Sequence, residues 1–233
     1  MTQKRDILLL HGALGSKEQF DQLKKGLSPY FSVYDLNFEG HGGRFSDRNF
    51  SIDVFTENLL EFLQEKNLND VIVFGYSMGG YVALNLALNY PEKVKQIITL
   101  GTKFDWSREV SEREVRLLNP ETIETKVPHF AQKLKEEHSP IDWKVVMKKT
   151  AEMMLRMGGG QKLVEKEFER IIHPIRIGIG NKDQMVSIKE SEKISSLLPN
   201  AELVVLEEVP HPIEKIDSER LLNYILDSFK IAK

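Results

Sequence analysis

Short apolar segments recur along the chain, and within them apolar and polar positions do not alternate. They span residues 7–10, 31–36, 71–74, 96–100, 175–179 and 202–206. Apolar runs without alternation are typical of strands that helices cover on both faces of a parallel sheet. Amphipathic segments with helical spacing lie between them, at residues 17–27, 52–65, 78–89, 188–198 and 218–229. The alternation predicts an α/β fold, with an open, mostly parallel six-stranded sheet and helices on both faces.

One long segment interrupts this alternation. Residues 107–170 have helical patterns without a β-rich run, and Pro120, Pro128 and Pro140 punctuate them. The segment is too long and too helical to be another crossover between strands. We interpret it as a helical cap inserted into a core domain that residues 1–106 and 171–233 form together.

Composition and charge exclude several classes of function. Lys and Arg number 32 against 35 Asp and Glu, so the net charge of −3 offers no basic field for nucleic acid. The chain has no cysteine, which excludes disulfides, thiolate metal ligands and thiol nucleophiles. The brief apolar run at residues 7–10 does not fit a signal peptide, and no stretch is long enough to cross a bilayer. We expect a cytoplasmic protein that binds neither nucleic acid nor membrane; its oligomeric state stays open.

The strongest chemical signal is Gly75-Tyr76-Ser77-Met78-Gly79, which stands between an apolar run and a helical pattern. A serine on a sharp strand-to-helix turn needs neighbours without Cβ atoms, and its hydroxyl then projects from the edge of the sheet. The first amides of the following helix favour negative charge that develops there. Ser77 is therefore the candidate nucleophile, provided that a base and an orienting acid lie nearby. The alternative is a plain glycine-rich turn with a solvent-exposed serine.

A base and an acid are expected at the carboxyl ends of other predicted strands, where open α/β sheets place their sites. Of the six histidines, His11, His41 and His211 follow predicted strands. His211 stands between two prolines, which hold its loop in extended geometry, so we predict that it is the base. Asp183 follows the fifth predicted strand and is preferred over Asp105 as the acid that orients this base.

The loop after the first predicted strand, residues 10–15, completes the expected site. Its glycines let backbone N–H groups face a neighbouring group, as an oxyanion hole requires. We predict the amides of Ala13 and Met78 as the two oxyanion donors. For His11 a structural role in the turn is favoured over catalysis, and His41 is interpreted as loop architecture or pocket wall.

These motifs together resemble the α/β-hydrolase superfamily. His11-Gly12 and Gly40-His41-Gly42 follow the first two strands, and the serine turn, the aspartate and the last histidine follow in the family's chain order. The resemblance covers nearly the whole chain and implies a helical cap at residues 107–170. It also implies roles for five residues: nucleophile Ser77, general base His211, orienter Asp183, and oxyanion donors Ala13 and Met78. A serine instead of an aspartate argues against the family's haloalkane dehalogenases and epoxide hydrolases.

The predicted function is that of a cofactor-independent serine hydrolase, which acts on a small carboxylic ester or related acyl compound through an acyl-enzyme. Two alternatives remain open. The same residues could serve carbon–carbon bond hydrolysis or a cofactor-free lyase, with Arg44, Arg48 or Arg156 holding a substrate carboxylate. A small-ligand binding protein on a hydrolase scaffold is the second alternative. No helical His pair or acidic cage indicates a metal, and none is expected.

Predicted substrate contacts come from both parts of the chain. Leu14 and Tyr76 adjoin the predicted oxyanion loop and the nucleophile. Met153 and Met157 belong to a methionine cluster of the cap, which could line an adaptable apolar pocket. Met147, Met154 and Met157 also follow helical spacing, so packing of a buried helix is the favoured interpretation of the cluster.

Overall fold

Six parallel strands form one open sheet in residues 4–229, the part of the chain that this computed structural model describes. The spatial order of the strands is β2-β1-β3-β4-β5-β6, so the predicted fold class is confirmed. The first three and last four residues of the predicted core lie outside the described residues. The strands are β1 (Arg5–Leu10), β2 (Phe31–Asp35), β3 (Val71–Tyr76), β4 (Val94–Leu100), β5 (Ile175–Gly180) and β6 (Ala201–Leu206).

Both faces of the inner strands β1, β3, β4 and β5 are buried, which explains their apolar runs, whereas the edge strands β2 and β6 are partly exposed. In β1, Leu8 and Leu10 pack into one hydrophobic cluster, whereas Ile7 and Leu9 pack into a second cluster on the opposite face. All four side chains are fully buried. Because successive side chains point to opposite faces, each strand that is covered on both sides needs apolar residues at every position.

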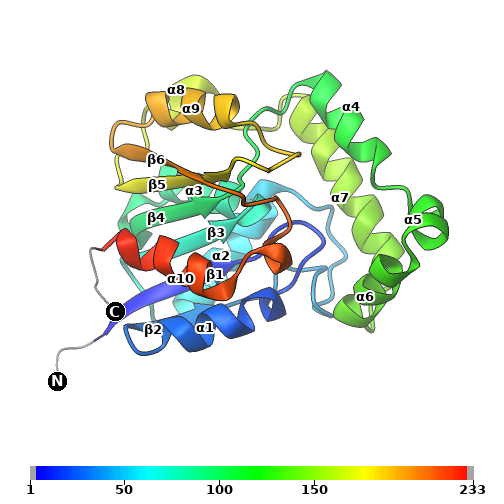
Figure 1. The fold of residues 1–233 in the computed structure, drawn as a ribbon, viewed down its shortest axis with the longest axis horizontal. Helices are drawn as coiled ribbons and strands as arrows, with labels where there is room; N and C mark the ends of the chain where they lie inside the picture. Colours follow the sequence, from blue (N-terminus) through cyan, green and yellow to red (C-terminus); the bar gives the residue numbers. More distant parts are fainter. Residues whose placement is uncertain (1–3, 230–233) are drawn as a thin grey trace.

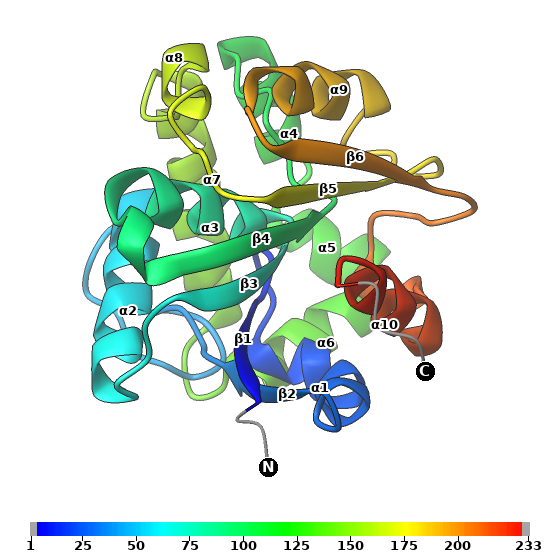
Figure 2. The same ribbon diagram turned by 90° about the vertical axis from the view of Figure 1, so that its left-hand side faces the viewer.

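Two helices cover one face of the sheet, and three helices cover the other. The packing clusters and the turned view in Figure 2 separate α1 and α10 on one face from α2, α3 and α9 on the other. Side-chain caps fix three of their starts: Ser51 accepts from Val54 N before α2, Ser187 and Glu190 form a capping box before α9, and Asp217 accepts from the first amides of α10. The helices are α1 (Asp21–Leu27), α2 (Ile52–Glu65), α3 (Met78–Asn89), α9 (Ile188–Leu197) and α10 (Ser218–Asp227), with short 3₁₀ turns at Lys17–Phe20, Pro91–Lys93 and Ile213–Lys215.

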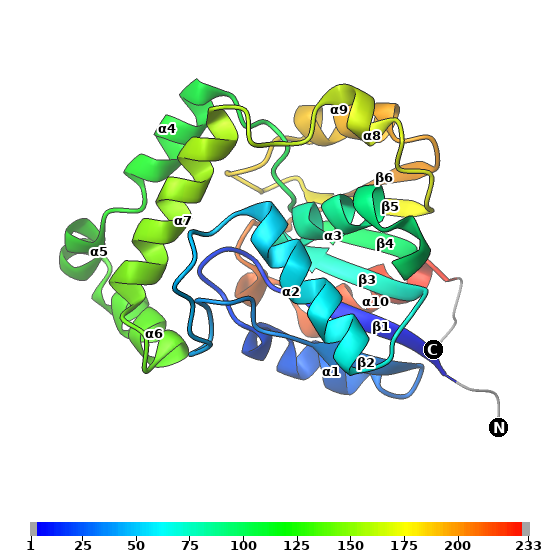
Figure 3. The same cartoon turned by 180° about the vertical axis from the view of Figure 1, so that it is seen from behind.

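A second group of helices lies beyond the carboxyl ends of the strands (Figures 1 and 3). Pro120 and Pro128 each open a helix, at the first position where a missing N–H costs nothing. These cap helices are α4 (Arg108–Arg116), α5 (Pro120–Lys126), α6 (Pro128–His138) and α7 (Trp143–Gly158). The short α8 (Glu165–Phe168) lies beside α9. The boundaries 107–170 for a separate cap stay a prediction. No helix within residues 4–229 has the length and apolar character to span a bilayer.

Candidate active site

Ser77 occupies a strained turn between β3 and α3. Its φ of 50° and ψ of −117° lie where residues with a Cβ are uncommon, and its N–H donates to Leu100 O at 2.8 Å. The flanking glycines make the turn possible. A Cβ on Gly75 would lie 2.4 Å from Gly80 N, and one on Gly79 would lie 2.3 Å from Leu10 O. The turn thus holds Ser77 at the carboxyl end of β3, and the neighbouring backbone leaves no space for a side chain at Gly75 or Gly79.

His211 and Asp183 meet at the same edge of the sheet. His211 Nδ1 lies 2.7 Å from Asp183 Oδ2, and the two side chains are 9% and 2% exposed. The other carboxylate oxygen, Oδ1, accepts the backbone N–H groups of Met185 and Val186, both at 2.8 Å. Because the carboxylate can only accept, Nδ1 carries the proton and Nε2 is left as a proton acceptor.

Because Gly101 has no side chain, it leaves space for the His211–Asp183 pair. It follows β4 with a φ of +61°, and a Cβ there would lie 3.3 Å from both Asp183 Oδ2 and His211 Nδ1. The imidazole is also fixed from the nucleophile's side, since Tyr76 OH donates to the backbone oxygen of His211 at 2.9 Å. Burial raises the pKa of Tyr76, so the phenol stays a donor.

The loop after β1 runs directly against the nucleophile. A Cβ on Gly12 would lie 3.3 Å from Ser77 Cβ, and Ala13 lines the same cavity as Ser77. Met78 is the first residue of α3, where backbone N–H groups have no acceptor inside the helix. The amides predicted as oxyanion donors therefore belong to segments on two sides of the serine.

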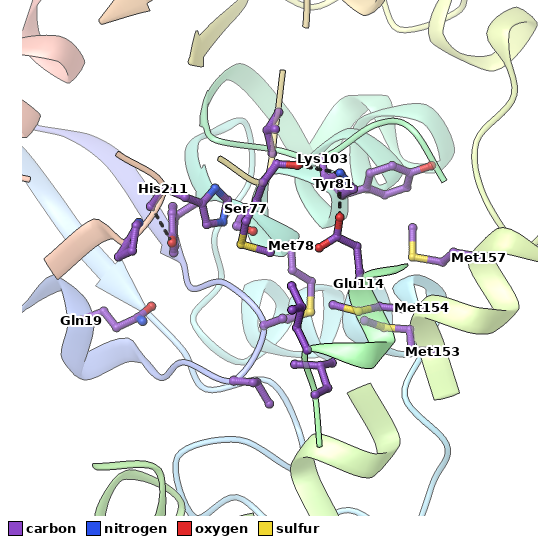
Figure 4. Close-up of a pocket in the computed structure, with 18 of the residues that line it drawn as sticks. Gln19, Ser77, Met78, Tyr81, Lys103, Glu114, Met153, Met154, Met157 and His211 are labelled. Atoms are coloured by element: carbon purple, nitrogen blue, oxygen red, sulfur yellow. Dashed lines mark hydrogen bonds and ion pairs between the residues drawn. The ribbon is translucent and has the colours of Figure 1, made fainter. Parts of the chain in front are cut away.

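A cavity of about 340 Å³ joins these groups. Figure 4 shows His211 beside Ser77 at its wall, with methionines of α7 across from them. All four predicted substrate contacts line it: Leu14, Tyr76, Met153 and Met157. Met154 lines it too, while Met147 packs inside the cap on Trp143 and other apolar residues. The methionine cluster thus serves both as packing and as cavity wall.

A family model described as the alpha/beta hydrolase fold matches residues 7–140, more than half of the chain. The chain belongs to the alpha/beta hydrolase family. Two curated relatives are Lipase 3 of Moraxella sp. strain TA144, 26% identical over 226 residues (88% of this chain, 71% of the relative), and Lipase 1 of Psychrobacter immobilis, 25% identical over 239 residues (94% and 75%). The solved structure of 2-hydroxy-6-oxo-6-phenylhexa-2,4-dienoate hydrolase from Rhodococcus sp. strain RHA1 has a TM-score of 0.80 at 18% identity, with 98% of this chain and 91% of that chain covered.

Three other histidines of this alpha/beta hydrolase are buried around the loops that follow β1 and β2. His11 Nε2 accepts from Phe38 N at 3.2 Å, so its Nδ1 donates to Gly12 O at 2.8 Å. Burial lowers the pKa of His11 to about 4, and it also lowers the pKa values of His41 and His138. His11 therefore has the structural environment expected for it, and none of the three lines the central cavity.

His138, on α6, was not predicted as a site residue, because it does not follow a predicted strand. It nevertheless joins the cap to the core. Gly42 N donates to His138 Nδ1 at 3.1 Å, so His138 Nε2 donates to Leu14 O at 3.1 Å. Leu14 follows Ala13, whose amide is a predicted oxyanion donor. The contact spans 124 positions in the sequence, and no local pattern signals it.

Sequence reasoning also missed the charged residues of the cavity wall. They are Lys103, Glu114, Lys133, Glu137 and Glu214, of which the first two are buried. Lys103 follows β4, and Glu114 lies on α4; their side chains are 7% and 5% exposed and lie 3.4 Å apart. Lys103 could have been predicted if every charged residue that follows a predicted strand had been considered as a site residue. Asp105, the rival orienting acid, is exposed and caps its own chain by accepting from Ser107 N.

The three arginines considered for a substrate carboxylate are engaged elsewhere. Arg48 pairs with Glu39 and Glu57, Arg156 donates to Phe50 O at 2.7 Å, and Arg44 donates to Asn37 O at 3.0 Å. None of them lines the cavity. Within residues 4–229, no three His, Cys, Asp or Glu side chains are grouped as ligands for a metal ion.

Proposed function

We propose that this hydrolase cleaves carboxylic esters through an acyl-enzyme on Ser77. The observation that carries the proposal is the 2.7 Å contact between His211 and Asp183 beside a serine on a strained turn, at the wall of one apolar cavity. A serine becomes a nucleophile only when a base accepts its proton and an acid orients that base. The names of the two lipase relatives support an ester as the bond that is cleaved.

In the proposed reaction, Ser77 Oγ bonds to the ester carbonyl carbon while His211 Nε2 takes the hydroxyl proton. The carbonyl oxygen becomes an oxyanion that accepts from the amides of Ala13 and Met78, each lowering the barrier by about 3 kcal/mol. His211 then gives its proton to the departing alcohol. A water molecule, deprotonated by His211, attacks the acyl-enzyme, and the acid and free Ser77 are released.

The alternatives have less support from the residues. A protein that only binds a small ligand has no chemical need for a serine, a histidine and a carboxylate in this arrangement. The arginines that would have favoured a substrate carboxylate, as in the carbon–carbon hydrolase or lyase hypothesis, contact other groups. The substrate contacts proposed for the ester are Leu14, Tyr76, Met153 and Met157, on opposite walls of the cavity.

The test combines chemical labelling with turnover. A fluorophosphonate probe is expected to label Ser77, and short-chain aryl esters are expected to be hydrolysed by the wild type. Ser77→Ala should lose both properties, with kcat reduced by at least about a thousandfold. The matched control is Ser196→Ala, an exposed position on α9, which should keep them. Equal ester hydrolysis by the wild type and Ser77→Ala would reject the proposal.

A further inference from the structure

Lys103 and Glu114 form a buried ion pair, here called the polar pair, in the wall of the catalytic cavity. Lys103 comes from the core loop after β4, and Glu114 comes from the cap helix α4. Figure 4 shows the pair between Ser77 and the methionines Met153, Met154 and Met157 of α7. The cavity lining is mostly apolar. Lys133, Glu137 and Glu214 also line it, but Lys103 and Glu114 are its buried charged pair.

Stability alone does not account for this pair. Two charges lose hydration when they are buried, and apolar residues of similar volume often stabilise a fold as well or better. An attachment of α4 to the core could equally be made by apolar packing, as the attachment of α4 to its cap neighbour α7 is. A buried pair at a cavity wall is better explained by what it can bind.

The polar pair has hydrogen-bonding capacity that the protein does not use. An ammonium carries three N–H donors, and Lys103 Nζ donates one of them to Met185 O at 2.7 Å. Its 3.4 Å separation from Glu114 Oε1 exceeds the usual charge-assisted hydrogen bond of about 2.7–2.9 Å. Glu114 Oε1 accepts from Arg113 at 2.9 Å, while Glu114 Oε2 has no hydrogen bond within residues 4–229. The ammonium of Lys103 thus has unused N–H donors, and the neighbouring carboxylate of Glu114 has an unused acceptor oxygen, Oε2.

We propose that the polar pair binds a neutral polar group of the substrate, a hydroxyl or a primary amide. Such a group can accept from Lys103 Nζ and donate to Glu114 Oε2 at the same time. A substrate carboxylate would be attracted by Lys103 and repelled by Glu114, and a substrate ammonium would meet the reverse. Arg113 changes this balance little, because its side chain is 61% exposed and its charge is screened. This inference rests on the proposed ester hydrolysis and narrows its substrate class to hydroxylated or amide-bearing esters.

The experiment compares aryl esters that differ only at one end. Each ester carries a chain that ends in a methyl, a hydroxyl, a primary amide, a carboxylate or an ammonium group. The chain is made in two lengths, and it is attached either to the acyl group or to the alcohol. The wild type is expected to prefer the hydroxyl or amide ester over the methyl ester by about tenfold or more in kcat/KM, since unpaired polar groups in the site reject the apolar analogue. The charged esters should be poorer than either neutral polar ester.

The decisive variant replaces both partners. Lys103→Met/Glu114→Leu keeps the volume and leaves no unpaired charge buried, since Arg113, which loses its partner, is 61% exposed; the variant is expected to fold and to prefer the methyl ester. The control Lys144→Met/Glu124→Leu makes the same changes in an ion pair of the cap that does not line the cavity, and its preference should match the wild type. A merely structural pair would lower all rates together without reversing the preference.

The outcomes separate the two proposals. Hydrolysis with the same chain preference in the wild type and the Lys103→Met/Glu114→Leu variant would overturn the polar-pair inference and leave ester hydrolysis intact. A wild-type preference for the carboxylate or the ammonium ester would also overturn it. Failure to hydrolyse any ester, together with no labelling of Ser77 by the fluorophosphonate, would overturn the proposed function and the inference with it.

Discussion

The carboxyl edge of the sheet and the cap helices above it are built in different ways. At the sheet edge, backbone geometry fixes the side chains: Ser77 N bonds to Leu100 O, and Asp183 accepts two backbone N–H groups. The cap is instead tied down by long side chains that reach backbone oxygens of the core. Lys149 on α7 donates to the oxygens of residues 46 and 48, and Arg156 donates to Phe50 O.

Under the proposed function, this difference assigns the chemistry to the sheet edge and the selectivity to the cap. Short loops after parallel strands have few conformations, so they would hold the reacting atoms within the narrow tolerances that the proposed acyl transfer needs. Side-chain ties between a cap and a core can be exchanged without changing the sheet, so the cap can vary the shape and polarity of the cavity. The polar pair of Lys103 and Glu114 lies on the boundary, with one residue from each region.

The largest expected effect is a loss of activity when Asp183, at the sheet edge, is replaced. Asp183→Asn removes the negative acceptor that holds His211 in the right tautomer, and kcat for an aryl ester should fall by about 10⁴-fold. Asp105→Asn is the matched control, because Asp105 follows the neighbouring strand but is exposed. Its kcat should stay near the wild-type value. Steady-state kinetics of both variants tests the comparison, and a similar loss in each would show that the carboxylate at 183 has no special role.

The candidate site residues at this edge could be predicted because functional residues of open α/β sheets follow the carboxyl ends of strands. Apolar runs without alternation identify the strands of a parallel sheet, and parallel strands bring their carboxyl ends to one edge. Ser77, Asp183 and His211 all follow such runs, so residues far apart in sequence could be grouped without coordinates. The segments 52–65 and 78–89 match α2 and α3, because caps and glycines mark their ends.

The cap contacts could not be predicted in this way. Helical periodicity shows that a helix has an apolar side, but not which part of the core it meets. The contact of His138 with Leu14 and the pairing of Glu114 with Lys103 depend on how α6 and α4 are placed, which no local pattern encodes. The segment at 17–27 shows a smaller difference, as it divides at Phe20 into a 3₁₀ turn and α1.

The next effect concerns stability at acid pH. His11 has a pKa of about 4 in the fold and 6.5 as its ordinary value, so between these values only the unfolded chain takes up a proton. The contribution of His11 to stability is therefore complete well above pH 6.5 and is lost as the pH falls; His11 alone should remove about 2 kcal/mol between pH 8 and 5. His41 and His138 act in the same direction, because burial lowers their pKa values too. Urea unfolding at several pH values measures this loss, and a flat profile would contradict it.

A somewhat smaller effect is expected where the cap meets the first loop. His138→Phe keeps a ring but removes both nitrogens, which leaves Gly42 N–H and Leu14 C=O without their partner. The loss should be about 1–2 kcal/mol in unfolding free energy, with faster hydrogen exchange in α6. His138→Gln, which keeps a donor and an acceptor, should recover part of it. If both variants match the wild type in exchange, the cap is held by packing rather than by this histidine.

The smallest expected effect is at the mouth of the cavity. Lys133 on α6 pairs with Glu214 in the turn after His211 at 3.2 Å, but the two side chains are 45% and 50% exposed. Exposed ion pairs contribute little because water and salt screen them, so Lys133→Ala should change the unfolding free energy by no more than about 0.5 kcal/mol. Lys135→Ala, on the same helix and without an ion-pair partner within residues 4–229, is the control. A loss for Lys133→Ala above about 1 kcal/mol, beyond that of the control, would mean that the cap is fixed at its exposed rim rather than by its buried contacts.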